Sequence, residues 1–437
     1  MHPDPTLDEL LGRRPHVSMH AVSGLMLDDV PLRAVADALG TPVWVTGADT
    51  LRARYRELAG AFREAALAVS VHYAVKANDH LAVLRVLQAE GAGADVVSGG
   101  ELRRALAAGI SPGSIVFSGV GKSDDELRLA IGVEVGQINV ESAEEMLRLS
   151  ALSVAVGRVS RIALRVNPDI DAGSHDKIST GRRGDKFGID HRDIPMLYAE
   201  AGRLPGLRPV GLAVHIGSQI AAAAPFRHAF ARIAGLVGAL REAGEHVETV
   251  DCGGGLGVCY RDEGSLSPRA LAGAMRATLG DIGVRLAIEP GRWLVAPAGV
   301  LLASVLLVKR QQRAPPFIVL DAAMNDLLRP SLYGSWHGIV PLSPAAALRP
   351  VAPAHVVGPV CETGDGFARD RMLPTLAAGD RVAILDTGAY GSVMSSTYNA
   401  RPLAAQALVD RGRWATIRAR PPVEALWRDE TVPDWLA

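Results

Sequence analysis

The sequence predicts an α/β fold, a TIM-like (β/α)8 barrel followed by a β-rich domain, and three observations support this. Short β-branched runs alternate with amphipathic segments between residues 68 and 290, which is typical of parallel βαβ units. There are eight such runs, the number that closes a barrel. Most of these runs are followed directly by a polar residue, which is typical of barrel enzymes, where functional groups gather at the carboxyl ends of the strands. An open doubly wound sheet is the alternative, but its ligand site draws on fewer strands.

The barrel elements follow one another in order along the chain. The eight predicted strands are residues 69–75, 94–97, 115–118, 137–140, 161–166, 210–215, 249–252 and 284–288. The segments between them predict helices, among them residues 80–89, 101–108, 124–129 and 143–149. The residues of interest at the strand ends are Lys76, Asp95, Ser118, Glu141, Arg165, Asn167, His215, Asp251, Gly253 and Glu289.

The character of the chain changes after about residue 295. Alternating β-rich runs punctuated by Pro and Gly predict strands at residues 300–308, 317–321, 356–360 and 381–386. Residues 42–46 also predict a strand, which is expected to join this domain. We therefore expect a barrel over residues 45–295, with residues 1–44 and 296–437 forming a β-sandwich or β-barrel-like domain.

Composition bounds the class of protein. A chain of 437 residues is too long for one ordinary core, and 48% hydrophobic with 21% charged residues excludes a largely disordered chain. A formal net charge of −1 gives no reason to expect nucleic acid or membrane as partner. Met1–Pro5 lack the basic and apolar regions of a secretory signal, and the apolar residues 293–308 are short for a membrane span. We therefore expect a cytoplasmic protein, and its wealth of Ala, Arg and Gly is typical of a GC-rich bacterial genome.

The three cysteines, Cys252, Cys259 and Cys361, are too few and too scattered for a disulfide framework or a metal site. We interpret Cys252 and Cys259 as packing residues.

Lys76 stands at the exit of an apolar strand. Burial disfavours an ammonium group and lowers its pKa, and a neutral amine is what a Schiff base requires. The alternative is a lysine that simply extends from a strand end into water.

A glycine run, GGGLG at residues 253–257, follows the seventh strand, where barrel phosphate sites occur. Glycines there let backbone N–H groups approach a phosphate, although a tight turn also needs glycine. The run lacks the Lys-Ser/Thr of a nucleotide P-loop, which favours a small phosphorylated cofactor.

Two further strand ends complete a set. His215 is followed by Gly217 and Ser218, so the ring is suited to stack on a cofactor and the serine to bind phosphate; a core histidine is the alternative. Glu289 precedes a Pro-Gly turn and is suited to keep a ring nitrogen protonated, while Arg292 offers a two-pronged group for a carboxylate. A Schiff-base lysine, phosphate donors, a stacking ring and a ring-nitrogen partner are the parts of a pyridoxal 5'-phosphate site.

Longer motifs carry a family resemblance. They include residues 73–78 (YAVKAN), 94–101 (ADVVSGGE), 164–168 (LRVNP), 179–181 (STG), 321–330 (DAAMNDLLRP), 358–365 (GPVCETGD) and 388–391 (GAYG). On these motifs the chain resembles the fold-type III pyridoxal-phosphate decarboxylases, and among them most closely the diaminopimelate decarboxylases, in register from about residue 40 to residue 410.

The resemblance implies an alanine-racemase-like fold, a head-to-tail homodimer with shared active sites, and Lys76 as the residue that carries pyridoxal 5'-phosphate. It implies Cys361 of the partner subunit as the catalytic acid. The other implied cofactor residues are Asp95, Arg165, His215, Ser218, Gly254, Gly255, Glu289, Gly291, Arg292 and Tyr390. The implied substrate residues are Arg292, Arg329, Tyr333, Glu362 and Tyr390, with Glu362 supplied by the partner subunit.

The implied activity is decarboxylation of meso-2,6-diaminopimelate to L-lysine and carbon dioxide, the last step of lysine biosynthesis. A related decarboxylase of ornithine, lysine, arginine or a carboxylated polyamine is an alternative, but Arg329 and Tyr333 suit a distal carboxylate rather than an amine. An amino-acid racemase would place arginine where Glu289 stands. A non-catalytic relative would not need Lys76 and Cys361. The chain departs from its relatives at Ala213, where another His is frequent, and at Gln406, where Glu is usual.

Overall fold

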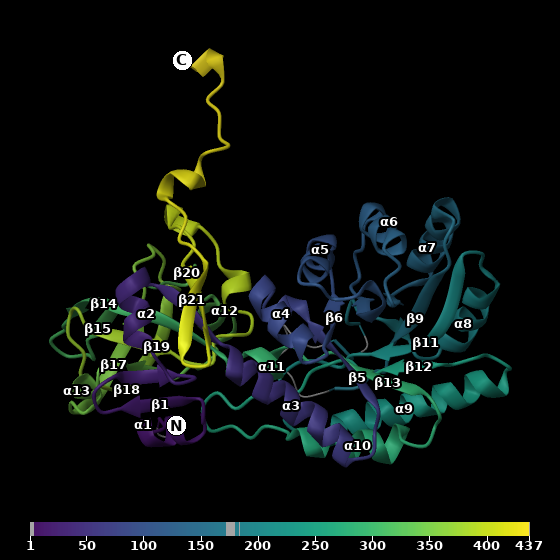
Figure 1. The fold of residues 1–437 in the computed structure, drawn as a ribbon, viewed down its shortest axis with the longest axis horizontal. Coiled ribbons are helices and arrows are strands. Elements are labelled where there is room, and N and C mark those ends of the chain that lie inside the picture. Colours follow the sequence, from purple (N-terminus) through teal and green to yellow (C-terminus); the bar gives the residue numbers. More distant parts are fainter. Residues whose placement is uncertain (1–3, 172–179, 183, 437) are drawn as a thin grey trace. The chain divides into compact units, whose positions relative to one another are not determined.

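The structure, a computed structural model, describes residues 4–171, 180–182 and 184–436 (Figure 1). Met1–Pro3 and Ser179, which entered the sequence predictions, lie outside the described residues. The chain divides into two units, one of residues 51–259 and 264–294 and one of residues 1–50, 260–263 and 295–437.

The first unit is a closed parallel barrel, which confirms the predicted fold class. Strand β13 pairs with β5, and β9 pairs with both β8 and β11, so the ring of eight strands has no open edge. The strands are β5 (Val69–Ala74), β6 (Gly93–Val96), β7 (Ile115–Phe117), β8 (Gln137–Val140), β9 (Ser160–Asn167), β11 (Leu207–Val214), β12 (Thr249–Asp251) and β13 (Arg285–Ile288), with the short β10 (Ile189–Asp190) beside β9.

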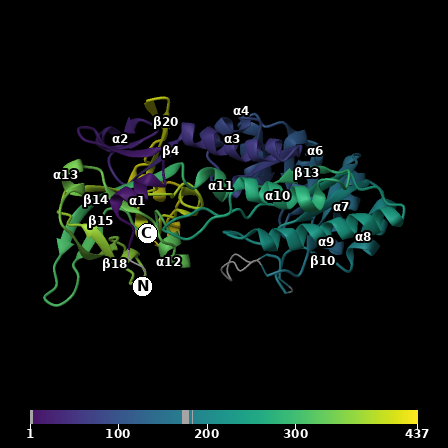
Figure 2. The same ribbon diagram turned by 90° about the horizontal axis from the view of Figure 1, so that it is seen from below.

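Helices surround this barrel, and serine caps begin several of them. The Oγ atoms of Ser98, Ser123, Ser142 and Ser267 each accept a backbone N–H from the first turn of the helix that follows. Helices α9 and α10 pack side by side (Figure 2). The helices are α3 (Ala48–Glu64), α4 (Leu81–Ala89), α5 (Gly99–Ala107), α6 (Asp124–Gly132), α7 (Ala143–Val156), α8 (Ile194–Arg203), α9 (Ala223–Glu242) and α10 (Pro268–Leu279).

The second unit is built on a mixed β-sheet in which β4 (Val43–Gly47) lies between β14 (Gly299–Lys309) and β20 (Ala405–Asp410). Side chains alternate between its faces: Val43 and Val45 enter one apolar cluster and Trp44 the other. The remaining strands are β15 (Phe317–Leu320), β16 (Ile339–Pro341), β17 (Val351–Val357), β18 (Gly366–Pro374), β19 (Arg381–Ile384) and β21 (Arg413–Arg418).

The N-terminal residues, which the motifs left unexplained, cover one face of this sheet. They form α1 (Leu7–Gly12), the small sheet β1 (Val17–His20), β2 (Gly24–Leu27) and β3 (Val30–Pro31), and α2 (Leu32–Leu39). Leucines and valines from these elements are buried in the same cluster as Val43 and Val45. Among the described helices, none is long and apolar enough to cross a membrane.

Candidate active site

Lys76 lies in a 3-10 turn, Val75–Ala77, that follows β5 directly. Its Nζ lies 2.9 Å from Oδ2 of Asp95, which is the third residue of the neighbouring strand β6. The Asp95 side chain is completely buried, whereas 37% of the Lys76 side chain is exposed. Oδ1 of Asp95 is buried and has no hydrogen-bond partner among the described residues. Two predicted site residues therefore lie together, with the amine held at the edge of a buried carboxylate.

His215 follows β11, and its ring is neutral. The backbone N–H of Gly254 donates to Nδ1 over 3.0 Å, so Nδ1 is an acceptor and the ring proton sits on Nε2. Burial, and then the charges of Arg165 and Lys76, hold the pKa of His215 well below its usual range. A neutral ring fits the predicted stacking role.

The backbone conformation and close packing of the loop after β12 leave no room for a side chain at residues 253–255. Gly253 and Gly255 have φ angles of 66° and 104°, which disfavour other residues. A Cβ on Gly254 would lie 2.2 Å from the carbonyl oxygen of Glu289, and one on Gly255 would lie 2.5 Å from that of Gly217. The loop therefore lies close against the strand ends on both sides.

Ser218 and Arg292 meet beside this loop. Arg292 begins the short helix α11 (Arg292–Val295), directly after Gly291, and its guanidinium donates to Ser218 Oγ over 3.1 Å. The glycine loop also bonds here, because the N–H of Ile220 donates to the carbonyl of Gly255 over 2.9 Å. Hydroxyl, guanidinium and close backbone are thus gathered, as a phosphate site requires.

Glu289 follows β13 and is buried. Its Oε1 accepts from Ser118 Oγ at 3.3 Å and from Asn139 Nδ2 at 3.4 Å. Burial, and then the nearby carboxyls of Asp251 and Asp95, raise the pKa of Glu289 well above its usual range. Glu289 is therefore set to hold a proton, or to bind a group that brings one.

Arg165, in β9, has a buried partner that sequence reasoning noted only as a strand-end residue. Its guanidinium lies 2.7 Å from Oε1 of Glu141 and 4.9 Å from the ring centre of Phe187. The other oxygen of Glu141 accepts the N–H of Gly188 over 2.9 Å. This ion pair ties β8 and β9 at the carboxyl end of the barrel.

In the second unit, Arg329 and Tyr333 lie at the two ends of α12 (Arg329–Tyr333). The Arg329 guanidinium is 5.9 Å from the Tyr333 ring centre and 5.4 Å from that of Tyr260, and it donates to the Tyr260 hydroxyl over 3.4 Å and to Ser335 Oγ over 3.2 Å. Tyr260 was missed by sequence reasoning. It is 69 positions from Arg329, and nothing near either residue in the sequence signals the contact.

Cys361 and Glu362 lie in the loop that follows β17, and both are exposed. The N–H of Cys361 donates to Asn399 Oδ1 over 3.0 Å. A hydrogen bond to Glu362 raises the pKa of Tyr398 above its usual range. Tyr390 lies in the loop after β19, with φ 54°.

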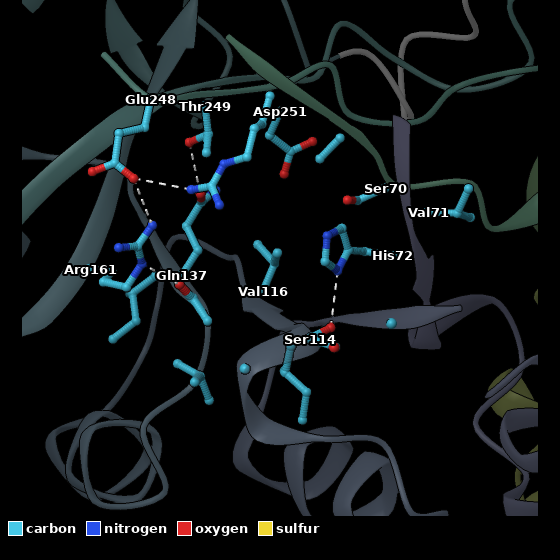
Figure 3. A pocket seen from close by; sticks show the side chains of 18 of the residues that line it. Ser70, Val71, His72, Ser114, Val116, Gln137, Arg161, Glu248, Thr249 and Asp251 are labelled. Carbon is cyan, nitrogen blue, oxygen red and sulfur yellow. Dashed lines mark hydrogen bonds and ion pairs between the residues drawn. The ribbon is translucent and has the colours of Figure 1, made fainter. Parts of the chain in front are cut away.

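A cavity of about 840 Å³ lies at the opposite, amino-terminal mouth of the barrel, and none of the predicted site residues lines it (Figure 3). Glu248 accepts there from Arg161 and Arg285 over 3.2 and 3.1 Å. Thr249 donates to Gln137 over 3.3 Å, and Gln137 donates in turn to Asn139 over 2.8 Å. This polar chain runs through the barrel interior from the cavity to the residues that bind Glu289.

Comparison with known proteins agrees with this arrangement. Residues 48–296 match the family model described as pyridoxal-dependent decarboxylase, pyridoxal binding domain. The diaminopimelate decarboxylase of Zymomonas mobilis is 46% identical over 416 residues, covering 94% of this chain and 98% of the relative. That of Pseudomonas aeruginosa is 44% identical over 410 residues, covering 93% and 97%.

Solved structures agree as well. The crystal structure of diaminopimelate decarboxylase from M. jannaschii superposes with a TM-score of 0.91 at 32% identity, covering 97% of this chain and 99% of that one. The Helicobacter pylori enzyme complexed with L-lysine gives a TM-score of 0.87 at 37% identity, covering 91% and 99%. This chain belongs to the diaminopimelate decarboxylases, within the pyridoxal-dependent decarboxylase family.

Proposed function

We propose that this protein decarboxylates meso-2,6-diaminopimelate to L-lysine and carbon dioxide, the last step of lysine biosynthesis, in the cytoplasm of a bacterium. The observation that carries the proposal is the match to diaminopimelate decarboxylases over 94% of the chain. It spans both units and therefore includes Lys76 as well as Arg329 and Cys361.

The barrel residues fit pyridoxal 5'-phosphate. Lys76 would carry it, with Asp95 orienting the amine from 2.9 Å. Ser218, Arg292 and the glycine loop would form the phosphate cradle, and the loop can lie this close to Gly217 and Glu289 only because Gly254 and Gly255 carry no Cβ. Neutral His215 would stack on the ring. The residues we assign to the cofactor are Lys76, Asp95, Arg165, His215, Ser218, Gly254, Gly255, Glu289, Gly291, Arg292 and Tyr390.

When bound, the cofactor supplies the electron sink that accepts the electron pair left behind as carbon dioxide departs. Glu289 would strengthen that sink by holding a proton at the ring nitrogen. An arginine there would weaken it, which is why Glu289 favours decarboxylation over racemisation.

The second unit supplies substrate recognition. Arg329 is buried against Tyr260 and Tyr333, so its guanidinium is fixed and suited to a carboxylate at the far end of the substrate. Arg292 and Tyr390 would also contact the substrate.

We further propose a homodimer in which each barrel is completed by the partner subunit. Glu362 of the partner subunit would bind the distal ammonium, and Cys361 of the partner subunit would return a proton to the substrate carbon. Both residues are exposed on their own chain, as this role requires.

The test measures carbon dioxide and lysine from meso-diaminopimelate, with ornithine, lysine and arginine as competing substrates. We expect turnover of diaminopimelate alone, and no turnover by Lys76→Ala. Borohydride should fix the cofactor to Lys76, which peptide mass spectrometry locates. Faster release of carbon dioxide from ornithine than from diaminopimelate, or a label on another lysine, would refute the proposal.

A further inference from the structure

Asp251 and Glu289 are neighbours on adjacent strands. Asp251, the last residue of β12, pairs in register with Ala287 of β13. Residues two apart on a strand point to the same face, so Glu289 follows Ala287 on the face that Asp251 shares. Both side chains are buried, with Asp251 1% and Glu289 8% exposed.

The oxygen atoms of these two carboxyls have different partners. Oδ1 of Asp251 accepts the N–H of Gly253 over 2.9 Å. Oδ2 of Asp251 is buried and has no hydrogen-bond partner among the described residues. Two buried carboxyls on one face of adjacent strands disfavour each other's ionised form, because water does not screen their charges. One of them is therefore expected to carry a proton, which it can donate to the other.

The polar chain from the amino-terminal cavity determines which Glu289 oxygen that proton occupies. Thr249 donates to Gln137, Gln137 to Asn139, and Asn139 to Glu289 Oε1. Ser118 donates to the same oxygen. Ser118 and Asn139 both donate to Oε1, so Oε1 is an acceptor and a proton on Glu289 is left to Oε2. Figure 3 shows Thr249, Gln137 and Asp251 where this chain leaves the cavity.

The surroundings of Glu289 favour its protonated form. Burial has the largest effect, because it disfavours the charged carboxylate, and the negative charges of Asp251 on β12 and Asp95 on β6 act in the same sense. The positive charge of Lys76, on the turn after β5, acts in the opposite sense. The net effect raises the pKa of Glu289 well above its usual range.

We propose that Asp251 is a positioning residue that keeps a proton on Glu289 until the cofactor binds, so that Glu289 itself delivers the proton to the ring nitrogen. The O–H bond of Glu289 breaks and an N–H bond forms, which leaves Glu289 as the carboxylate that faces a protonated ring. The inference rests on the proposed function in placing Glu289 at that nitrogen.

The experiment counts the protons that enter or leave solution when pyridoxal 5'-phosphate binds to the full-length, cofactor-free protein. Titration calorimetry at one pH in buffers of different ionisation enthalpy gives this number. Asp251→Asn keeps the acceptor for Gly253, but its amide donates permanently to Glu289 and leaves Glu289 ionised. We expect this variant to take up about one more proton per site from solvent than the wild type does.

Cys252→Ala is the matched control. Cys252 is the next residue, is equally buried, and points to the other face of the chain, so its replacement should leave the wild-type proton count unchanged. Equal proton counts in wild type and Asp251→Asn would overturn the inference.

Infrared spectroscopy of the wild type covers the case in which Asp251→Asn does not fold. The cofactor-free protein should show the carbonyl stretch of a buried protonated carboxyl group, and this band should vanish when pyridoxal 5'-phosphate is added. Its absence before addition, or its persistence afterwards, would contradict the inference. Neither measurement involves substrate, so a protein that passes both but does not decarboxylate diaminopimelate would refute the proposed function alone.

Discussion

At the scale of single residues, Lys76 and Asp95 show a contact that serves chemistry better than stability. A buried ion pair is a weak source of stability, because taking each charge out of water costs several kcal/mol. Here the carboxylate is completely buried while the ammonium is partly exposed. Asp95 therefore holds the amine in place without enclosing it, and the amine stays accessible to a carbonyl group.

Arg329→Ala should severely weaken turnover of diaminopimelate. Loss of a charge-assisted, two-pronged partner for a substrate carboxylate costs on the order of 2–5 kcal/mol. We expect kcat/KM to fall accordingly, while the visible absorbance of the cofactor stays at the wild-type level.

The matched control for this variant is Arg369→Ala, at an exposed position of β18 in the same unit. It should leave kcat/KM unchanged. An Arg329→Ala protein with wild-type kcat/KM would remove Arg329 from substrate binding.

At the scale of elements, the glycine loop after β12 has no room for a side chain at Gly254. Gly254→Ala would place a Cβ 2.2 Å from a backbone carbonyl, and overpacking of this kind costs about 1–3 kcal/mol. The dissociation constant for pyridoxal 5'-phosphate should therefore rise by roughly tenfold or more.

Gly238→Ala, in helix α9, is the control for this substitution, because a Cβ there meets nothing within 4 Å. Alanine in a helix is favoured over glycine by roughly 0.5–1 kcal/mol, so this variant should bind the cofactor normally and be slightly more stable. Equal cofactor affinity in both variants would mean that the loop does not contact the cofactor.

Helix α5 should make stability depend on pH through Glu101. Burial raises the pKa of Glu101 from 4.5 to about 7, even though its side chain accepts the N–H of Val97. Between these values the unfolded chain has released the proton and the folded chain still holds it, so stability falls as pH rises through this window. Across this window the free energy of unfolding falls by about 3 kcal/mol at most.

Glu101→Gln removes this titration. The difference in urea midpoint between Glu101→Gln and wild type should grow in favour of the variant from pH 5 to pH 8. Asp125→Asn, at an exposed position of α6, is the control and should follow the wild type at each pH. A constant difference for Glu101→Gln would show that Glu101 is ionised throughout the range.

All eight barrel strands were predictable because each is a short run with β-branched or other aliphatic residues between amphipathic segments, yet their limits shift where pairing decides them. Strand β11 begins at Leu207 rather than at the predicted residue 210, through a register shift at Pro209. The predicted strand at residues 356–360 instead ends at Val357, where Gly358 and Pro359 follow and the proline has no N–H to donate.

Other parts of the fold and site were beyond sequence reasoning. Strand β18 carries arginines and an aspartate along its length and forms through pairing with β17, a contact that its own pattern does not reveal. Tyr260 and Asn399 reach Arg329 and Cys361 from distant positions in the chain. Asp251 was visible as a strand-end residue, but its pairing with Glu289 depends on strand register.

At the scale of the whole molecule, the predicted acid and the predicted lysine belong to different units of the chain. Cys361 is exposed in the second unit, and Lys76 lies in the barrel. Apolar side chains are also exposed in the segment after β21, where Trp435 is 84% accessible (yellow in Figure 1). Large exposed apolar side chains are frequent where proteins associate, which agrees with the proposed dimer.

Mixing two inactive variants tests this shared site. Lys76→Ala and Cys361→Ala should each be nearly inactive. In a closed two-fold dimer that joins one chain of each kind, one site holds both defects and the other holds none. Random pairing makes about half of the dimers mixed, and half of the sites in these are intact, so activity should recover to roughly a quarter of wild type. Differently tagged chains establish that subunits have exchanged, and a mixture of Lys76→Ala with itself, tagged in the same way, is the control that must stay inactive. Proven heterodimers without activity would mean that Cys361 serves the barrel of its own chain or takes no part in the reaction.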